Sequence, residues 1–295
     1  MNKTRINRNL IIFTIATLGA GWLGLALNQA MGIQDAQQSL GILLWLVIPL
    51  LTALLLRAFG GDGWQDFGLT PHLRSGWAWY LVAALIFPLA SFLTLGFGTM
   101  IGIISLSGFA SQGLAAFLTL TGIAFASSLV KNIFEEFAWR GYLTPRFEAL
   151  KLNPFVNHLL TGLIWSAWHI PYWLFFVSQA QWPEFTSLDR PTFILLGVLI
   201  NTASAITYGE LRLLSKTVWP AVILHSMANA VTLTLLVNGF VQLSSDREAL
   251  FSPGNAGIIT ASLLTLAGIG LHHYRMKKSP ARILPAPGLS SQPQA

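Results

Sequence analysis

Three short polar patterns contain the residues of this chain that could catalyse a reaction. In chain order they read Glu135-Glu136-x-x-x-Arg140, Trp165-x-x-x-His169 and His225-x-x-x-Asn229. Helical residues four positions apart share a face, so Glu136 can pair with Arg140 and the third pattern stacks an imidazole on a carboxamide. Glu135 is turned by about 100° from Glu136 and need not join that ion pair. One glutamate can therefore be structural while the other does chemistry.

Two hydrolytic mechanisms fit these residue types. A carboxylate with an imidazole can remove a proton from water, and a second imidazole with an amide N–H can stabilise the resulting oxyanion. This arrangement would hydrolyse a peptide bond without a covalent intermediate. Alternatively, Glu135, His169 and His225 could ligate Zn²⁺ with water in the fourth position, which lowers the pKa of that water towards ~7. The residue types alone leave both mechanisms open.

Several other hydrolase classes lose support because their signatures are missing from the sequence. There is no cysteine, which excludes a cysteine nucleophile and a thiolate zinc site. Neither Gly-x-Ser-x-Gly nor His-Glu-x-x-His occurs, and no Asp lies within an apolar stretch. These absences argue against serine, zincin-type and paired-aspartate intramembrane proteases.

Composition indicates that membrane helices position the three patterns. Of the 295 residues, 54% are hydrophobic and only 9% are charged, against about 25% charged in soluble domains. A spanning helix needs about 20 mainly apolar residues. We predict an all-α polytopic bundle of about eight transmembrane helices, at 10–31, 40–58, 77–97, 114–131 with a polar continuation to 143, 156–178, 191–208, 219–240 and 256–274.

The direction of the predicted helices brings the three patterns to similar depths. The fourth helix reaches the cytoplasm after Glu135, whereas the fifth and seventh leave it before His169 and His225. The three groups then lie roughly 10–20 Å below that face. An ionisable residue inside a span costs several kcal/mol, so each is a functional candidate. We expect the three helices to form one pocket.

The distribution of basic residues predicts the topology. Most of the 17 Lys and Arg residues fall on one side of the eight-span arrangement, and Arg190 and Arg247 fall opposite. Because short cytoplasmic loops retain basic residues, both termini are predicted to be cytoplasmic. The net charge of +6 is explained by this topology, so no nucleic-acid partner is expected. The basic residues next to the membrane are also expected to contact anionic lipid.

We predict a single transmembrane domain over residues 1–278, with the motif-bearing core at about 114–240 and a disordered cytoplasmic tail at 279–295. The Gly-rich loop 60–69 and most of the 11 tryptophans suit the membrane interface. Lys131 is expected to snorkel or to pair with a nearby acid. Other polar residues are assigned to interface solvation or helix packing: His158, His272, His273, Asn201, Thr207 and Glu210.

The three patterns together resemble the CAAX-processing and bacteriocin-processing (CPBP) family, which includes type II CAAX prenyl endopeptidases and bacterial Abi-type proteins. The patterns occur in family order on three predicted spans, and residues 218–225 resemble the stretch that leads into the last motif. The resemblance covers about 134–229 and departs from the family at Trp165, where the pattern has Phe. That departure affects substrate fit more than chemistry.

By this resemblance, Glu135 and His169 would activate water, while His225 and Asn229 would hold the oxyanion. Glu136 and Arg140 would brace the fourth helix, and Trp165 would line the pocket. The resemblance implies a glutamic-type intramembrane protease, with no metal favoured although zinc stays possible. The protein would lie in a bacterial plasma membrane, with its site open towards the cytoplasm. Its substrate would be a membrane-associated peptide or protein.

Two other functions are compatible with a polytopic bundle. A proton-coupled transporter would use Glu135, Glu136 and the two histidines as a relay. It predicts inverted repeats and matching broken helices, which the sequence does not show. A non-catalytic membrane scaffold or chaperone of the same fold would be favoured by loss of motif residues, but all of them are present.

Overall fold

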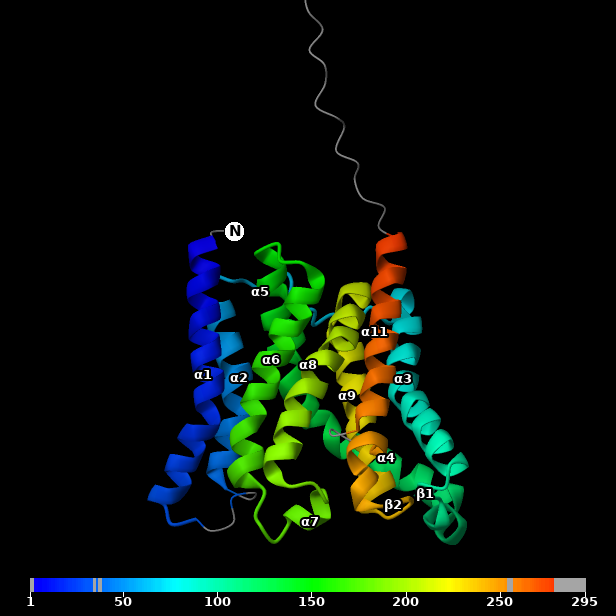
Figure 1. Cartoon of the computed structure of the whole chain (residues 1–295). Helices are drawn as coiled ribbons and strands as arrows, with labels where there is room; N and C mark the ends of the chain where they lie inside the picture. Colours follow the sequence, from blue (N-terminus) through cyan, green and yellow to red (C-terminus); the bar gives the residue numbers. More distant parts are fainter. Residues whose placement is uncertain (1–2, 34–35, 37–38, 254–256, 279–295) are drawn as a thin grey trace, which may run out of the picture.

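The computed structural model describes residues 3–33, 36, 39–253 and 257–278, which form a bundle of long helices (Figure 1). The predicted tail at 279–295 lies outside the described residues. Eight long helices coincide in order with the predicted spans: α1 (Lys3–Ala30), α2 (Leu40–Ala58), α3 (Leu73–Met100), α4 (Ser107–Ala138), α6 (Pro154–Pro171), α8 (Arg190–Ser215), α9 (Trp219–Thr232) and α11 (Ile258–Lys278).

Short elements complete the described chain. They are α5 (Thr144–Ala149), α7 (Trp182–Phe185), α10 (Glu248–Phe251), a 3₁₀ turn at Ser245–Arg247, and the strands β1 (Ile104–Ser105) and β2 (Gln242–Leu243). The two strands pair antiparallel with Ile104 opposite Leu243. Three π-helical turns directly follow the helices that carry the polar patterns: η2 (Trp139–Leu143), η3 (Tyr172–Phe176) and η4 (Leu233–Val237).

The prediction of an all-α membrane bundle is confirmed. Among the described residues, six helical segments are long and apolar enough to cross a membrane: α1, α2, α3, α4 continued to Ala149, α8, and α9 continued to Val237. Helices α6 and α11 occupy the other two predicted places. Helix α6 carries His158 and His169, and α11 ends with three basic residues. The count of eight spans stays a prediction.

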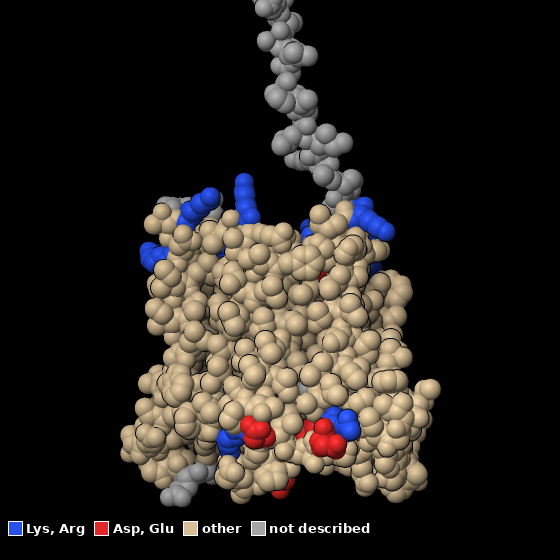
Figure 2. All heavy atoms as spheres, in the orientation of Figure 1, with Lys and Arg blue, Asp and Glu red and all other residues tan. Residues whose placement is uncertain are grey.

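The start of α1 and the end of α11 lie at the same end of the bundle (Figure 1). In the view of Figure 2, Lys and Arg side chains gather at that end, while acidic side chains accompany a few basic ones at the other. This asymmetry agrees with the predicted cytoplasmic position of both termini. We refer below to the basic end and the opposite end of the bundle.

Close helix packing positions the patterned helices against their neighbours. Helix α8 packs against α6 and α11, and α9 packs against α3 and α4. At the α6–α8 crossing, a Cβ on Gly162 would lie only 2.7 Å from the Cβ of Ala205. Small residues let helix backbones approach in membranes, where no hydrophobic force drives helices together. Gly162 therefore fixes the distance between these two helices.

Two aspartates of the Gly-rich loop after α2 take part in a polar junction with buried arginines, which the assignment of the loop to the membrane interface did not predict. Asp66 Oδ1 lies 2.8 Å from Arg57 Nη1, and Asp62 Oδ1 lies 3.3 Å from Arg146 Nη1. Tyr142 also donates to Asp62 Oδ2 at 2.8 Å. The side chains of both arginines and of Asp62 are fully buried. The loop thus joins α2 to η2 and α5.

We predict that Asp62→Ala destabilises the bundle by about 3–5 kcal/mol, because it leaves Arg146 buried with a weakened counter-charge. Thermal unfolding of the purified protein in detergent would measure the change. Asp246→Ala is the matched control, since Asp246 pairs with Arg247 on an exposed surface and exposed pairs contribute little. Equal melting temperatures for the two variants would contradict the buried-junction interpretation.

Candidate active site

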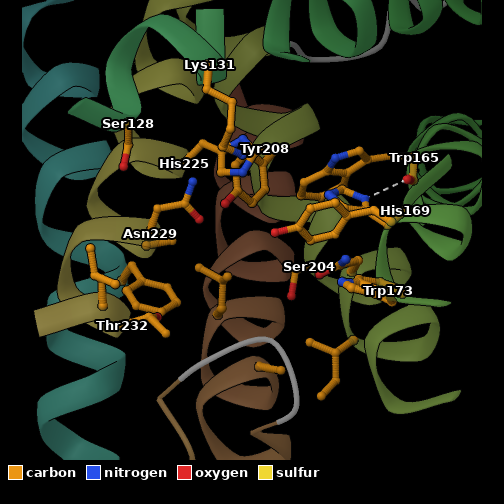
Figure 3. A pocket seen from close by; sticks show the side chains of 18 of the residues that line it. Ser128, Lys131, Trp165, His169, Trp173, Ser204, Tyr208, His225, Asn229 and Thr232 are labelled. Carbon is orange, nitrogen blue, oxygen red and sulfur yellow. Dashed lines mark hydrogen bonds between the residues drawn. The ribbon is translucent and has the colours of Figure 1, made fainter. Parts of the chain in front are cut away.

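The second and third polar patterns line one cavity of about 530 Å³ inside the bundle, and Lys131, which pairs with Glu135, lines it from α4. Figure 3 shows Trp165 and His169 from α6, His225 and Asn229 from α9, and Tyr208 from α8 around this cavity. Most other lining side chains are apolar. The cavity extends to Ile42 at the start of α2 and to Val237 at the end of η4. It therefore reaches from the motif residues towards the opposite end of the bundle.

Glu135 is held by two neighbours and is only 2% exposed. Its Oε1 lies 2.6 Å from Lys131 Nζ, which confirms that Lys131 pairs with a nearby acid. Its Oε2 accepts a hydrogen bond of 2.9 Å from the indole N–H of Trp165. The indole therefore fixes a carboxylate, a polar contact that phenylalanine at this position would lack.

His169 faces Glu135 with a defined ring nitrogen. Its Nδ1 lies 3.0 Å from the backbone oxygen of Trp165. Because a carbonyl oxygen only accepts, Nδ1 carries the hydrogen, and Nε2 of the neutral ring presents a lone pair. His169 Nε2 is 4.0 Å from Glu135 Oε2. This distance exceeds direct hydrogen-bond contact, and both atoms can contact one water molecule.

Four tryptophan rings surround His169. Trp173 stacks on the imidazole at 5.1 Å, while Trp45, Trp165 and Trp168 meet it edge-on at 5.8, 5.9 and 4.7 Å. All four are at most 4% exposed. The assignment of most tryptophans to interfacial belts was therefore wrong for these positions. A bulky aromatic cage restricts the ring orientation of His169.

The indoles of Trp45 and Trp168 also join α2 to α6. Their rings stack at 4.0 Å with an interplanar angle of 6°. Trp45 donates to the backbone oxygen of Trp168 at 2.9 Å, and Trp168 donates to that of Trp45 at 3.1 Å. This reciprocal pair satisfies both buried indole N–H groups next to His169.

Glu136 links α4 to α9 through one oxygen. Its Oε1 lies 3.0 Å from Arg140 Nη1, which confirms the predicted i, i+4 pair, and 2.9 Å from His225 Nδ1. Arg140 lies between the rings of Trp165 and Tyr208, at 4.6 and 4.5 Å from their centroids. Since a carboxylate only accepts, His225 donates through Nδ1. Its other ring nitrogen, Nε2, stays available for the cavity.

Asn229 is oriented by a residue that sequence reasoning missed. Its Nδ2 donates to Asn132 Oδ1 at 3.1 Å, and Asn132 Nδ2 donates to Ser226 Oγ at 3.1 Å. Asn132 is fully buried in α4. A carboxamide three residues before Glu135 in an apolar helix was an available signal. Tyr208, at the last position of the predicted sixth span, was missed as a wall of the cavity.

The proposed zinc ligands do not converge in the structure. Within the described ranges, no three His, Asp or Glu side chains form a group that could hold a metal ion. His225 Nδ1 is directed to Glu136, while Glu135 contacts Lys131 and Trp165. In this arrangement the three residues therefore do not fit a zinc ion, and no step of the mechanism below uses a metal. The preference for a metal-free mechanism stays a prediction.

A second buried polar cluster lies away from the cavity, near the basic end. Glu210 of α8 contacts His158 at 3.1 Å, His272 at 2.8 Å and Arg275 at 2.6 Å. Glu210 and His158 are fully buried. The assignment of His158 to a solvated interface was therefore wrong. This cluster ties α6, α8 and α11 together, consistent with the packing role expected for Glu210.

Comparison with known proteins agrees with these motifs. Residues 117–231 match the family model described as type II CAAX prenyl endopeptidase Rce1-like. The matched stretch contains all three polar patterns, so the resemblance inferred from them is confirmed. No curated protein matches the chain at a significant level.

We expect Trp45→Phe to lower the free energy of unfolding by about 1–2 kcal/mol, because it removes one indole donor and leaves the carbonyl of Trp168 without this partner. Trp22→Phe provides the matched control, since Trp22 is 50% exposed. Chemical or thermal unfolding in detergent would compare the two variants. If both variants unfold like the parent, the reciprocal pair does not stabilise the α2–α6 contact.

Proposed function

We propose that this chain, whose residues 117–231 form an Rce1-like domain, is an intramembrane endopeptidase that uses water activated by Glu135 and His169. The observation that carries the proposal is the facing pair of Glu135 Oε2 and His169 Nε2, 4.0 Å apart, beside a cavity that also receives His225 and Asn229. A general base needs reach to the proton that it removes, and this geometry provides it through one water.

The proposed reaction begins with a water molecule held by Glu135 and His169. Its oxygen attacks the scissile carbonyl carbon while one of its protons passes to Glu135. The carbonyl oxygen becomes an oxyanion, which accepts a hydrogen bond from Asn229 Nδ2 and, when the His225 ring is doubly protonated, from its Nε2–H. Glu135 then delivers the proton to the amine nitrogen as the C–N bond breaks. One water is consumed and two peptides are released.

The proposed substrate is a peptide or protein associated with the membrane. A cavity of about 530 Å³ with a mostly apolar wall suits a short peptide segment with apolar side chains. The distribution of Lys and Arg favours both termini in the cytoplasm. We propose a bacterial plasma membrane as the location, on the basis of the family resemblance and the compact size of the chain. An opening of the site towards the cytoplasm stays a prediction.

The alternative functions have less support. All catalytic candidates are present, and the matched family is described as an endopeptidase family. Neither observation favours a scaffold or a proton-coupled transporter. In addition, Glu136 pairs with Arg140 and His225, so it is not free to pass protons in a relay.

Cleavage of a peptide library, followed by mass spectrometry, tests the proposal. We expect Glu135→Gln to reduce kcat by about 10²–10⁴-fold, as for loss of a general base. His225→Asn should reduce it by about 10²–10³-fold, as for loss of an oxyanion donor. Glu184→Gln and His273→Asn are matched controls, because both residues are exposed and lie outside the cavity.

Helical content and melting temperature establish that each variant is folded. Cleavage that persists in folded Glu135→Gln would sink the assignment of Glu135 as the base. A chelator arm tests the mechanism separately: loss of cleavage on chelation, restored by Zn²⁺, would contradict the metal-free form of the proposal.

We further predict that Asn132→Ala reduces kcat by about 10–100-fold with little change in KM, because Asn229 loses the partner that orients it. Asn201→Ala is the matched control: Asn201 lines the same cavity from α8 but lies outside this hydrogen-bond chain. Steady-state kinetics on one peptide would compare the two variants. Equal kcat values would show that Asn132 does not position Asn229.

A further inference from the structure

Tyr208 of α8 brings to the cavity a phenol hydroxyl that the proposed reaction does not yet use. The residue lines the cavity and is only 3% exposed. Its ring meets those of Trp165 and His225 edge-on, with centroids 5.5 and 5.8 Å apart, and the guanidinium of Arg140 lies 4.5 Å from its centroid. Figure 3 shows Tyr208 between His225 and His169. Side chains of all three polar patterns therefore surround this ring.

The hydroxyl of Tyr208 has no hydrogen-bond partner within the described part of the chain, where its contacts are made by the ring. The oxygen is not enclosed by protein either, since the fully enclosed polar atoms without a partner in the described ranges belong to other side chains. A buried tyrosine hydroxyl normally has a partner, because its loss of hydration is otherwise uncompensated. The partner must therefore come from a molecule inside the cavity, either water or a bound peptide.

The oxyanion of the proposed reaction needs a donor of this kind. His225 donates through Nδ1 to Glu136, so Nε2 of the neutral ring is an acceptor and becomes a donor only in the imidazolium. Asn229 uses one of its two amide hydrogens for Asn132 and has one left. With His225 neutral, these two motif residues provide a single hydrogen bond, whereas oxyanion sites usually combine several donors. A phenol O–H donates without any change of protonation state.

A second tyrosine, Tyr172, lines the same cavity but is placed differently. It is half-buried, and its ring stacks on Trp45 of α2 with centroids 4.9 Å apart. Trp45 belongs to the aromatic cage of His169. Tyr172 thus lies on the side of the cavity that holds the proposed water, whereas Tyr208 contacts the ring of His225. Of the two hydroxyls, that of Tyr208 is the one beside the oxyanion donors.

We infer that Tyr208 is a further catalytic residue, whose hydroxyl donates a hydrogen bond to the oxyanion together with Asn229. As the water oxygen bonds to the carbonyl carbon, the carbonyl oxygen gains negative charge and accepts the O–H of Tyr208. The proton stays on the phenol, so the atoms and charges of the reaction balance as before, and water stays between Glu135 and His169. The inference rests on the proposed function and adds a donor that acts while His225 is neutral.

The variant Tyr208→Phe removes this hydroxyl and keeps the ring with its contacts. For one peptide cleaved by the full-length protein in detergent, we expect kcat to fall about 10²-fold, as for loss of an oxyanion donor. KM should change by less than about twofold, because the hydrogen bond forms in the transition state. Tyr274→Phe is the matched control and should keep the wild-type kcat, since Tyr274 is 41% exposed and lies outside the cavity. Tyr172→Phe should lower kcat far less than Tyr208→Phe.

A transition-state analogue separates binding of the oxyanion from packing. The probe is a fluorescent peptide with a phosphonate in place of the scissile amide and leucine on both sides, so that it presents a tetrahedral anionic oxygen. We expect it to bind Tyr208→Phe about 10²-fold more weakly than wild type, because such an analogue loses the interactions that the transition state loses. The same peptide with an ethylene group in place of the amide has no oxygen there and should bind both proteins equally.

Melting temperatures establish that each variant is folded. An unchanged kcat in folded Tyr208→Phe, a rise in KM alone, or equal phosphonate affinities of this variant and wild type would overturn the inference. Such results leave the proposed function intact as long as cleavage depends on Glu135. An equal loss of kcat in Tyr172→Phe would also overturn the assignment to Tyr208. Conversely, cleavage that survives in Glu135→Gln would remove the proposed function, whatever the phosphonate affinities.

Discussion

One oxygen of Glu136 accepts hydrogen bonds from both Arg140 and His225, and this contact organises the polar interior of the bundle. In lipid, a polar group has no water to bind and must find its partner on another helix. Glu136 therefore couples the end of α4 to the middle of α9. Removal of one partner of a buried ion pair lowers the free energy of unfolding by more than the intact pair contributes, because the other charge is left unpaired. Glu136, Arg140 and His225 therefore depend on one another.

The π-helical turn η2 extends this dependence to the basic end. A π turn changes the direction of backbone carbonyls, and two carbonyls of η2 are bound by arginines from elsewhere in the chain. Arg212 of α8 donates to the backbone oxygen of Arg140 at 3.1 Å, and Arg57 of α2 donates to that of Gly141 at 2.6 Å. The same two arginines hold the loop that contains Asp66. Thus α2, α8 and the loop after α2 all fix the segment that carries Arg140.

The sequence predicted the helices and the motif residues for reasons that are local. The length of the apolar stretch predicted both ends of α2 correctly. The predicted start of the fourth span follows Gly113, where α4 is interrupted by a φ of +83°. The i, i+4 spacing identified the pair of Glu136 and Arg140. These features depend on residues close in the chain, where periodicity and helix geometry are sufficient.

The features that were missed depend on contacts between distant residues. Nothing local indicates that Asp62 meets Arg146, since they are far apart in the chain and joined only by the tertiary fold. Tryptophan is compatible with both an interface and a core, so the cage around His169 could not be separated from an aromatic belt. The sequence shows Asn132 only as a carboxamide in an apolar helix, and its role as the partner of Asn229 depends on the packing of α4 against α9.

The two adjacent glutamates have different environments, and this difference argues for which of them does chemistry. Glu136 is fully buried, and its neighbours Arg140 and His225 are held in place by aromatic rings and by α9. A proton acceptor must exchange partners during a reaction, and Glu136 cannot do so without leaving Arg140 unpaired in the core. Glu135 has one fixed partner in Trp165 and one movable partner in Lys131, which is open to the cavity. The helical offset of about 100° between neighbouring residues thus gives one motif both a fixed structural carboxylate and an exchangeable one.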